Sequence, residues 1–441
     1  MVNSSIYWNQ VIETLPREKL RELQLRKFKR IMEWAYGNSP FYRSLYKAAG
    51  IEPGDIRTLD DIRRVPKIDK GMLRDVQSRD PFPYGDILAV PLSEVTEFRQ
   101  TSGTTGTPVY QADTWQDWEW WAECWAYILY AQGYRETDRL FLPFGYNIFV
   151  AFWACHYGAE KLGCEVVPGG VLDTEARIMK MKELKCTAFG ATPTYVLGMA
   201  DTAHRIGIDP KGIGIQRITC AGEPGASIPT TKQRIEDAWG AKVYDHIGAT
   251  EIGAWSYSCV FQRGLHVNEA FFLVEIEDTE TGEIIEEPGR NGKMVITAFD
   301  RIGKPCIRFD SKDVIRWADY SCECGRTFRI IDGGVVGRAD DITKVKGVLL
   351  APTAIEEVVR SFDELSDEYE VIVTKKGDID DIALKIEIKP GMEDRKESIL
   401  VRLKDELRVK TNLGYKIEVC PAGSLPRYEV KAKRFKDMRK H

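Results

Sequence analysis

The sequence predicts an α/β protein with a large N-terminal domain, in which helices cover sheets, and a small α+β C-terminal domain. Between residues 139 and 244, short apolar runs alternate with helical stretches, which is typical of a parallel sheet with helices on both faces. After Gly337 the pattern restarts with two strands, one long helix and another strand. We therefore place the large domain at residues 1–337 and the small domain at 338–441, with the boundary near 338–342.

The individual elements follow from apolar spacing and from breaker residues. Residues 17–36 carry apolar positions at helical spacing, so the first fifty residues are expected to be largely helical, and Pro40 ends this run. Short strands are expected over 87–100, then a helix over 113–133 whose five tryptophans we assign to the core. Further strands are expected at 139–144, 164–167, 188–189, 217–220, 242–244, 271–276, 293–298, 314–317, 369–374, 382–388 and 415–419. Helices are expected near 149–162, 174–184, 193–206, 228–239 and 392–410.

Composition and charge indicate an ordinary globular chain. Its 441 residues are 43% hydrophobic and 29% charged, which excludes a mainly disordered chain, a fibre and a small disulfide scaffold. No apolar run approaches the ~20 residues of a membrane span, and no secretory signal begins the sequence, so we expect a cytoplasmic protein without a membrane partner. The net charge of −5 argues against a nucleic-acid partner. The ten cysteines are expected to be reduced core residues, metal ligands or catalytic groups.

The most informative segment is a loop of small residues, Thr101-Ser102-Gly103-Thr104-Thr105-Gly106-Thr107-Pro108. Its two glycines allow tight turns that present backbone N–H groups, and its hydroxyl side chains add further donors, so the loop suits a polyphosphate. It is not a P-loop, because no Gly-Lys-Ser/Thr follows. Composition alone would predict a flexible loop, and it is the order of the residues that favours phosphate binding.

The order of this loop resembles the phosphate-binding motif of the adenylate-forming ligases, and the wider chain resembles their phenylacetate–CoA ligase branch. Residues 15–51 are similar to the helical lead-in of that branch, and residues 156–170, HYGAEKLGCEVVPGG, are similar to another of its signatures. The resemblance extends over nearly the whole chain. It implies a large domain that binds ATP and an acid, and a small mobile C-terminal lid that swings about Asp340.

The resemblance also implies how the chain would hold a nucleotide. Thr101 to Gly106 would hold the phosphates, and the turn Ala221-Gly222-Glu223-Pro224 would line the adenine, with Asp245 as a further nucleotide contact. Asp313 would accept hydrogen bonds from the ribose hydroxyls, because a carboxylate can accept from two neighbouring hydroxyl groups. Arg338 would approach the ribose or a phosphate.

Three further residues are implied to act at the reacting phosphate. Thr250 would donate to the α-phosphate and Glu251 would bind Mg²⁺, an ion that prefers oxygen ligands. Lys431 matches the catalytic lysine, whose compact ammonium lies where negative charge crowds during attack. The family often has an aromatic residue where this chain has Ile247, and usually a glycine where it has Val430. From charge alone, the basic end of the chain is typical of a solvated tail.

Three cysteines and one histidine form two close pairs along the sequence, and together they make up a cysteine–histidine set. Cys259 lies seven residues before His266, and Cys322 lies two residues before Cys324. Three thiolates and one imidazole complete a tetrahedral Zn²⁺ shell and leave no position open for chemistry, so the site would be structural. Similar residues occur at these places in the phenylacetate–CoA ligase branch. The alternative is a group of reduced core cysteines.

The function that these residues imply is an ATP-dependent, AMP-forming ligase that joins a carboxylic acid to coenzyme A through an acyl-adenylate. The acid pocket is expected around residues 144–149 and the following helix, with Tyr146, Phe149, Phe152 and Trp153 as lining residues. We expect an aromatic acid, phenylacetate- or benzoate-like, or a small branched acid. The bulk of Phe152 and Trp153 favours the shorter acids.

Two alternatives of other classes remain open. A nucleotidyltransferase of the same branch would adenylylate a phenolic cofactor without CoA. A degenerate member would bind ligand without turnover, but the presence of Thr250, Glu251, Asp313 and Lys431 argues against it. The oligomeric state is open as well, with a homodimer as one alternative.

Overall fold

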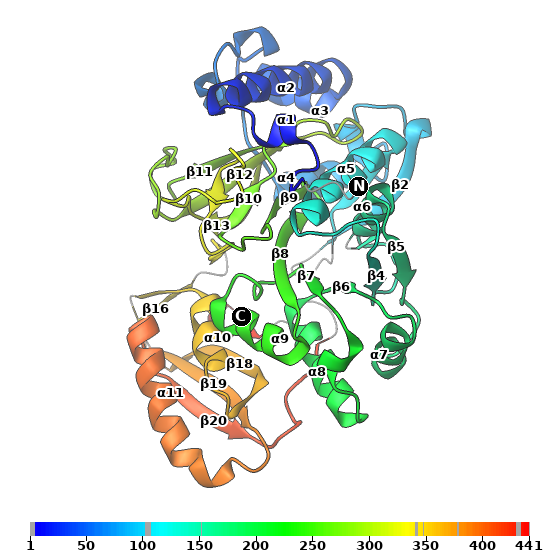
Figure 1. Cartoon of the computed structure of the whole chain (residues 1–441). Helices are drawn as coiled ribbons and strands as arrows, with labels where there is room; N and C mark the ends of the chain where they lie inside the picture. Colours follow the sequence, from blue (N-terminus) through cyan, green and yellow to red (C-terminus); the bar gives the residue numbers. More distant parts are fainter. Residues whose placement is uncertain are drawn as a thin grey trace.

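The computed structural model describes residues 5–101, 107–150, 152–339, 343–346, 348–376, 379–428 and 434–440 (Figure 1). The chain begins with helices α1 (Gln10–Glu13), α2 (Arg17–Asn38) and α3 (Pro40–Ala48), in agreement with the predicted helical lead-in. Pro40 follows the end of α2 but also opens α3, because Ser39 caps α3 and proline fits the first helical position. No helix in the described part of the chain is long and apolar enough to cross a bilayer.

The central sheet has eight strands in the order β14-β10-β9-β8-β7-β6-β4-β5. The neighbours from β5 to β8 are paired in parallel, which confirms the parallel sheet that the alternation predicted. Beyond β8 the pairing is antiparallel, so the sheet is mixed. Its strands are β4 (Arg139–Leu142), β5 (Glu165–Pro168), β6 (Ala188–Ala191), β7 (Arg217–Cys220), β8 (Lys242–Ala249), β9 (Gly253–Tyr257), β10 (Leu265–Val267) and β14 (Ile330–Ile331).

Helices cover both faces of this sheet. Side chains alternate between faces along a strand, and Leu140 and Leu142 belong to one core cluster whereas Phe141 belongs to another. The first cluster includes α5 and α6, and the second includes α7, α8 and α9. Four of the five tryptophans on α5 are buried, but Trp115, at the first helical position, is 55% exposed and is not a core residue. The helices are α5 (Trp115–Ala131), α6 (Trp153–Leu162), α7 (Thr174–Glu183), α8 (Pro193–Arg205) and α9 (Pro229–Trp239).

A second sheet has the order β1-β13-β12-β11, with β15 paired to β13. A separate hairpin of β2 and β3 precedes α5. The strands are β1 (Ile68–Asp69), β2 (Val95–Gln100), β3 (Tyr110–Thr114), β11 (Phe272–Glu277), β12 (Gly292–Ala298), β13 (Cys306–Ile315) and β15 (Gly337–Arg338), and helix α4 is Lys70–Gln77.

The strands expected over 87–100 form only in part. Residues 95–100 make β2, but short 3-10 turns occupy Gly85–Ile87 and Leu92–Glu94. Pro91 lies between these turns, and a proline cannot donate to a strand ladder. Other 3-10 turns lie at Pro53–Asp55, Asp60–Arg64, Pro210–Ile213, Glu393–Arg395 and Met438–Lys440.

The C-terminal part has a hydrophobic core of its own, made of residues between Val345 and Phe435. Its four-stranded sheet has the order β20-β19-β18-β21 and carries α10 and α11 (Figure 1). It lies against α9, where Thr230 Oγ1 donates to Glu357 O at 3.3 Å. The elements are β16 (Thr343–Val345), β17 (Val348–Leu350), α10 (Pro352–Arg360), β18 (Leu365–Lys376), β19 (Ile379–Ile388), α11 (Lys396–Thr411), β20 (Lys416–Cys420) and β21 (Phe435–Asp437).

Candidate functional site

The expected phosphate loop connects the two strands of a β-hairpin. Gln100 on β2 pairs with Tyr110 on β3, and Thr101 closes the hairpin. Thr101 N donates to Val109 O at 3.0 Å, and Val109 N donates to Thr101 Oγ1 at 3.0 Å. Helix α4 supports the exit of the loop, because Gln77 Nε2 donates to the carbonyl of Pro108 at 2.6 Å. The rest of the predicted motif lies outside the described residues, namely Ser102, Gly103, Thr104, Thr105 and Gly106.

Thr250 and Glu251 directly follow β8, and a buried ion pair holds their turn. Arg301 Nη1 donates to Thr250 O at 2.8 Å, and Arg301 Nη2 lies 2.7 Å from Asp113 Oδ1. Neither the arginine nor the aspartate side chain is exposed. Glu251 is buried, and its Oε1 lies 2.9 Å from Lys70 Nζ. The carboxylate implied to bind a metal therefore has a cation beside it within the chain.

A third cation, Lys304, lies close to this turn. Its side chain is buried, and its Nζ donates to the carbonyl of Tyr110 on β3. Burial, and then the charge of Arg301, lower the pKa of Lys304 to about 8, and the charge of Glu251 opposes this shift. Positive charge thus accumulates around the end of the hairpin and the Thr250–Glu251 turn, and such a concentration favours anionic ligands.

The predicted adenine turn and Asp245 lie side by side. The turn, Ala221 to Pro224, follows β7, and Cys220 at the end of β7 pairs in register with Asp245 on β8. Gly222 has a φ of +92°, a left-handed conformation that favours glycine. Both features lie at the carboxyl ends of parallel strands, the edge where open α/β sheets bind their ligands.

The polar side chains of this edge have specific partners. Glu223 Oε1 accepts a hydrogen bond from Thr194 N, at 2.8 Å, in the first turn of α8. Asp245 accepts a hydrogen bond from the hydroxyl of Ser227. Burial raises the pKa of Asp245 to about 6, and the hydrogen bond from Ser227 opposes this rise. Asp245 is therefore a carboxyl group that changes its proton occupancy close to neutral pH.

The two residues implied to bind ribose are neighbours in the second sheet. Asp313 on β13 and Arg338 on β15 form an antiparallel register pair. Arg338 Nη1 lies 3.5 Å from Asp313 Oδ1 and donates to Ser311 O at 3.2 Å. Both side chains are partly exposed, so a carboxylate and a guanidinium are presented together.

Phe152, one of the predicted acid-pocket residues, belongs to a buried aromatic cluster. Its ring stacks on Phe144 with centroids 4.1 Å apart and an interplanar angle of 7°. It also lies 6.4 Å from the ring of Trp125 on α5. A Cβ at Gly190 would come within 2.8 Å of Phe152, so the glycine is what lets this ring lie against β6.

Tyr146 and Trp153 pack together at the start of α6. Their rings meet edge to face at 4.8 Å, and Tyr146 Oη lies 2.8 Å from His156 Nδ1. The other ring nitrogen of His156 lies 3.0 Å from Glu160 Oε1, and burial raises the pKa of Tyr146. Phe149 is partly buried in the preceding loop, where its backbone N–H donates to the side chain of Asn147. The four predicted residues thus lie in one region of the chain.

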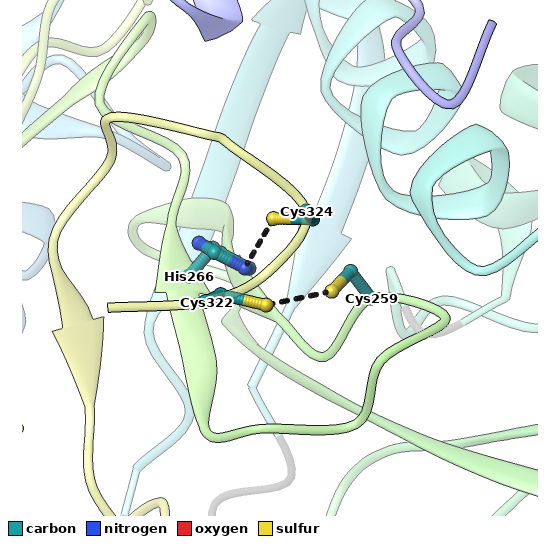
Figure 2. A group of neighbouring side chains, drawn as sticks. All are labelled: Cys259, His266, Cys322 and Cys324. Carbon is teal, nitrogen blue, oxygen red and sulfur yellow. Dashed lines mark hydrogen bonds between the residues drawn. The ribbon is translucent and has the colours of Figure 1, made fainter. Parts of the chain in front are cut away.

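The four residues of the cysteine–histidine set come together (Figure 2). Cys259, His266, Cys322 and Cys324 are all buried, and their ligand atoms lie within 4.8 Å of one another. Cys259 Sγ lies 3.6 Å from Cys322 Sγ, and Cys324 Sγ lies 3.4 Å from His266 Nε2. Hydrogen bonds from Cys259 and then Cys322 lower the pKa of Cys324, so the set favours a thiolate.

These distances fit the edges of a tetrahedral zinc site. With ordinary Zn–S and Zn–N bond lengths, neighbouring sulfur atoms lie about 3.8 Å apart and sulfur and nitrogen about 3.6 Å apart. The N-terminal segment covers the set, because Tyr7 Oη donates to Cys324 O at 2.6 Å. A fully buried ion pair between Arg326 and Glu13 lies next to this contact. The set therefore joins the segment after β9, strand β10 and the loop that precedes β14, and the Tyr7 contact links it to the start of the chain.

For the expected pivot and the expected catalytic lysine, the structure describes only the neighbouring residues. Asp340 and Lys431 lie outside the described residues. Before Lys431, Arg427 Nη2 lies 2.7 Å from Glu387 Oε2 within the small unit. After it, Arg434 contacts both the small unit and the large one, because Nη2 lies 2.8 Å from Glu368 Oε2 and Nη1 donates to Thr194 Oγ1.

Sequence reasoning missed the cations around Glu251. Lys70, Arg301 and Lys304 belong to no motif and are separated from Glu251 by many residues along the chain. A signal for Arg301 and Lys304 was present, since these two basic residues follow the strand expected at 293–298. Nothing in their spacing distinguishes them from surface cations, and only the packed structure brings them to the site.

This fold and this arrangement of residues define an adenylate-forming enzyme, and comparisons with known proteins agree. Residues 347–439 match the model of the AMP-binding enzyme C-terminal domain. The phenylacetate-coenzyme A ligase of Thermus thermophilus is 33% identical over 451 residues, which cover 97% of this chain and 99% of that protein. The corresponding ligase of Aromatoleum evansii is 31% identical over 437 residues, covering 97% of this chain and 96% of that protein. The chain therefore belongs to the phenylacetate–CoA ligase family, and it is an AMP-forming acyl-CoA ligase.

Solved structures give the same result and add information on conformation. A 2-hydroxyisobutyryl-CoA ligase in the postadenylation state is 27% identical and has a TM-score of 0.94, with 100% of this chain and 94% of that chain covered. The same relative in its thioesterification state, with equal identity and coverage, has a TM-score of 0.75. The arrangement of this chain is thus closer to the postadenylation state of that relative.

Proposed function

We propose that this enzyme joins a carboxylic acid to coenzyme A in two half-reactions at one site. In the first, a carboxylate oxygen of the acid bonds to the α-phosphorus of ATP, and the bond to pyrophosphate breaks. In the second, the sulfur of CoA attacks the acyl carbon, AMP leaves, and the thiol proton passes to solvent. The observation that carries this proposal is the position of Asp245, Thr250 and Glu251 on and directly after one strand, β8, at the carboxyl edge of the sheet.

The nucleotide is proposed to bind across this edge. The hairpin loop from Thr101 to Gly106 holds the phosphates, the turn from Ala221 to Pro224 and Asp245 line the adenine, and Asp313 with Arg338 holds the ribose. Thr250 donates to the α-phosphate. Lys431 supplies an ammonium between the acid and the α-phosphate, where negative charge develops and a preorganised cation is most effective.

Glu251 is the proposed ligand of Mg²⁺. One or two carboxylates together with substrate phosphates are the usual way to hold this ion, and the buried carboxylate of Glu251 fits that role. When bound, the ion would offset phosphate charge. Lys70, 2.9 Å from Glu251, is the residue of the chain that balances this carboxylate.

The domain motion is part of the proposal. Residues 1–337 form the large domain, residues 338–441 form the small one, and Asp340 is the pivot between them. The two TM-scores for one relative in two named states support a rearrangement of this kind. Two contacts across the boundary, of Arg434 with Thr194 and of Arg234 with Asp367, support the arrangement that is closer to the relative's postadenylation state.

The proposed substrate is an aromatic acid or a small branched acid. The names of the relatives, phenylacetate and 2-hydroxyisobutyrate ligases, span both classes. The proposed acid site borders the packed apolar rings of Phe144, Phe152 and Trp125, and Trp153 adds bulk at the start of α6. A compact acid fits this bulk better than an extended one.

Zinc is proposed at Cys259, His266, Cys322 and Cys324. Three soft sulfur donors and one imidazole, whose ligand atoms all lie within 4.8 Å of one another, favour this metal. All four positions come from protein, so the ion would stabilise the fold rather than take part in chemistry.

The decisive experiment is a pyrophosphate-release assay with a panel of aryl and short branched acids, run with and without CoA. The proposal predicts acid-dependent pyrophosphate release, and AMP and a thioester only when CoA is present. Transfer of AMP to a phenol without CoA would instead identify a nucleotidyltransferase.

A further inference from the structure

His246 is a buried side chain on β8 that has no role in the motifs described above. It is 6% exposed, and its ring lies 4.2 Å from the ring of Trp125 on α5. Gly190, Thr219 and Tyr244 pair in register across β6, β7 and β8, so they share one face of the sheet. His246, two residues beyond Tyr244, lies on the same face, which α5 and α6 cover.

The tautomer of His246 follows from the hydrogen bond of its ring to a backbone carbonyl. Nδ1 lies 3.0 Å from the carbonyl oxygen of Ser256, and a carbonyl can only accept, so Nδ1 carries the proton. Burial lowers the pKa of His246 to about 4, and the ring is therefore neutral at physiological pH. In a neutral ring protonated at Nδ1, Nε2 carries a lone pair and acts as a hydrogen-bond acceptor.

Nε2 has no hydrogen-bond partner within the described part of the chain, and the side chain as a whole is more than nine-tenths buried. Gly248 leaves room beside this nitrogen. A Cβ at Gly248 would lie 3.0 Å from Nε2 and 2.9 Å from Gly253 O, so any larger residue would crowd this nitrogen. The Ser256 contact thus fixes a ring whose acceptor nitrogen has no partner among the described residues.

His246 borders the residues proposed to hold the acid. Trp125 contacts both His246 and Phe152, and the ring of Phe152 lies against Gly190 on the same face of the sheet. Thr250, the proposed α-phosphate donor, follows His246 on the chain by only four residues. A ligand that reaches from the aromatic cluster toward Thr250 would therefore pass the acceptor nitrogen of His246.

We propose that Nε2 of His246 accepts a hydrogen bond from a hydroxyl group of the acid, so that the preferred substrates are hydroxy acids. This inference rests on the proposed function and deepens it. A plain acid would leave Nε2 unpaired when it displaces water, and a buried acceptor without a partner is costly. Sites built to bond a substrate hydroxyl can reject the analogue without it by up to about 10⁴- to 10⁵-fold.

The test compares matched acids that differ by one hydroxyl, by kcat/KM for CoA-dependent pyrophosphate release. The pairs are 2-hydroxyisobutyrate with isobutyrate, mandelate and 4-hydroxyphenylacetate with phenylacetate, and 3- and 4-hydroxybenzoate with benzoate. We expect at least one hydroxy acid to be favoured by about 100-fold or more. His246→Leu should reduce that ratio to within about threefold, and His246→Gln, which retains an acceptor, should restore part of it.

The ratio separates recognition from a purely structural role. Loss of the Ser256 contact in His246→Leu would lower activity toward both acids of a pair equally, and thermal unfolding would report it. His204→Leu, at an exposed position on α8, serves as the control and should leave the ratio unchanged. Ratios close to one in every pair, or a ratio that His246→Leu does not alter, would overturn the inference while leaving the ligase proposal intact. No pyrophosphate release with any acid would overturn the proposed function and this inference with it.

Discussion

Arg434 Nη1 donates to Thr194 Oγ1 at 3.1 Å, across the boundary between the small and large units. Arg434 follows the predicted catalytic Lys431 by three residues, and Thr194 lies in the first turn of α8, where its N–H donates to Glu223 of the adenine turn. Glu368 holds the other end of the guanidinium at 2.8 Å. The contact therefore links the segment after Lys431 to the predicted adenine site.

Arg434→Gln is expected to slow adenylation selectively. A hydrogen bond to a charged group contributes about 1.5–3 kcal/mol, so losing the Thr194 contact should lower acid-dependent pyrophosphate release by about 10- to 150-fold. Conversion of supplied acyl-AMP and CoA to thioester should change little. Arg402→Ala, whose partner Glu364 lies in the same unit, is the matched control. Equal losses in both half-reactions would contradict this role.

Lys431→Ala should nearly abolish adenylation while thioester formation from supplied acyl-AMP continues. Loss of one preorganised charge contact typically costs about 3–4 kcal/mol, or at least about a hundredfold in rate. Separate single-turnover assays of the two half-reactions would measure this. Lys410→Ala, a surface lysine of α11 paired with Glu357, should affect neither.

Asp340→Pro should produce the opposite pattern. Proline fixes φ and stiffens the proposed pivot, so adenylation should persist and thioester formation should fail. The same two assays report the outcome. Retention of both half-reactions would place the pivot elsewhere.

Cys322→Ser should remove zinc and lower the melting temperature. Elemental analysis of chelator-washed wild-type protein should find close to one zinc per chain, because four buried ligands converge without an open position. Cys186→Ser, at another buried free cysteine, should leave the metal content unchanged. Metal-free wild-type protein with full stability would exclude the site.

Trp153→Gly should enlarge the acid site. If Trp153 limits the length of the acid, kcat/KM for phenylacetate should rise relative to that for smaller acids by about ten- to two-hundredfold. This is the change in selectivity that space for about one additional methylene group typically produces. Trp115→Gly makes the same change at the first position of α5, where the side chain is exposed, and should leave the ratio as it is.

Asp245 and His246 should oppose each other in the pH dependence of stability. The folded pKa of His246, about 4, is below its ordinary 6.5, so its contribution grows as pH rises from 4 to 6.5. The folded pKa of Asp245, about 6, is above its ordinary 3.8, so its contribution to stability is lost as pH rises from 3.8 to about 6. Urea unfolding at pH 4 to 7 should therefore give a steeper rise for Asp245→Asn and a flatter one for His246→Gln. Identical slopes in both variants and the wild type would contradict these shifts.

Features that depend on local sequence patterns, such as the bounds of helices, could be predicted from the sequence. Helices α7, α8 and α9 begin and end within two residues of their predicted bounds, because prolines, capping residues and Gly240 mark their ends. The ion pair of Arg301 with Asp113 could not be predicted in this way. The two residues are 188 positions apart, and neither lies at a spacing that implies contact. The same holds for the neutral ring of His246, which depends on burial and on a carbonyl of the adjacent strand.

Strand β8 fixes the spacing between residues of three proposed parts of the site. Asp245 lies beside the adenine turn, His246 contacts the aromatic cluster, and Thr250 and Glu251 follow the end of the strand. Because successive side chains point to opposite faces, inserting one residue into β8 would turn every later side chain to the wrong side. Replacing a side chain, by contrast, leaves the spacing intact. An exchange at position 246 is therefore expected to change the proposed substrate preference without moving Asp245, Thr250 or Glu251, whereas an insertion in this strand would displace them.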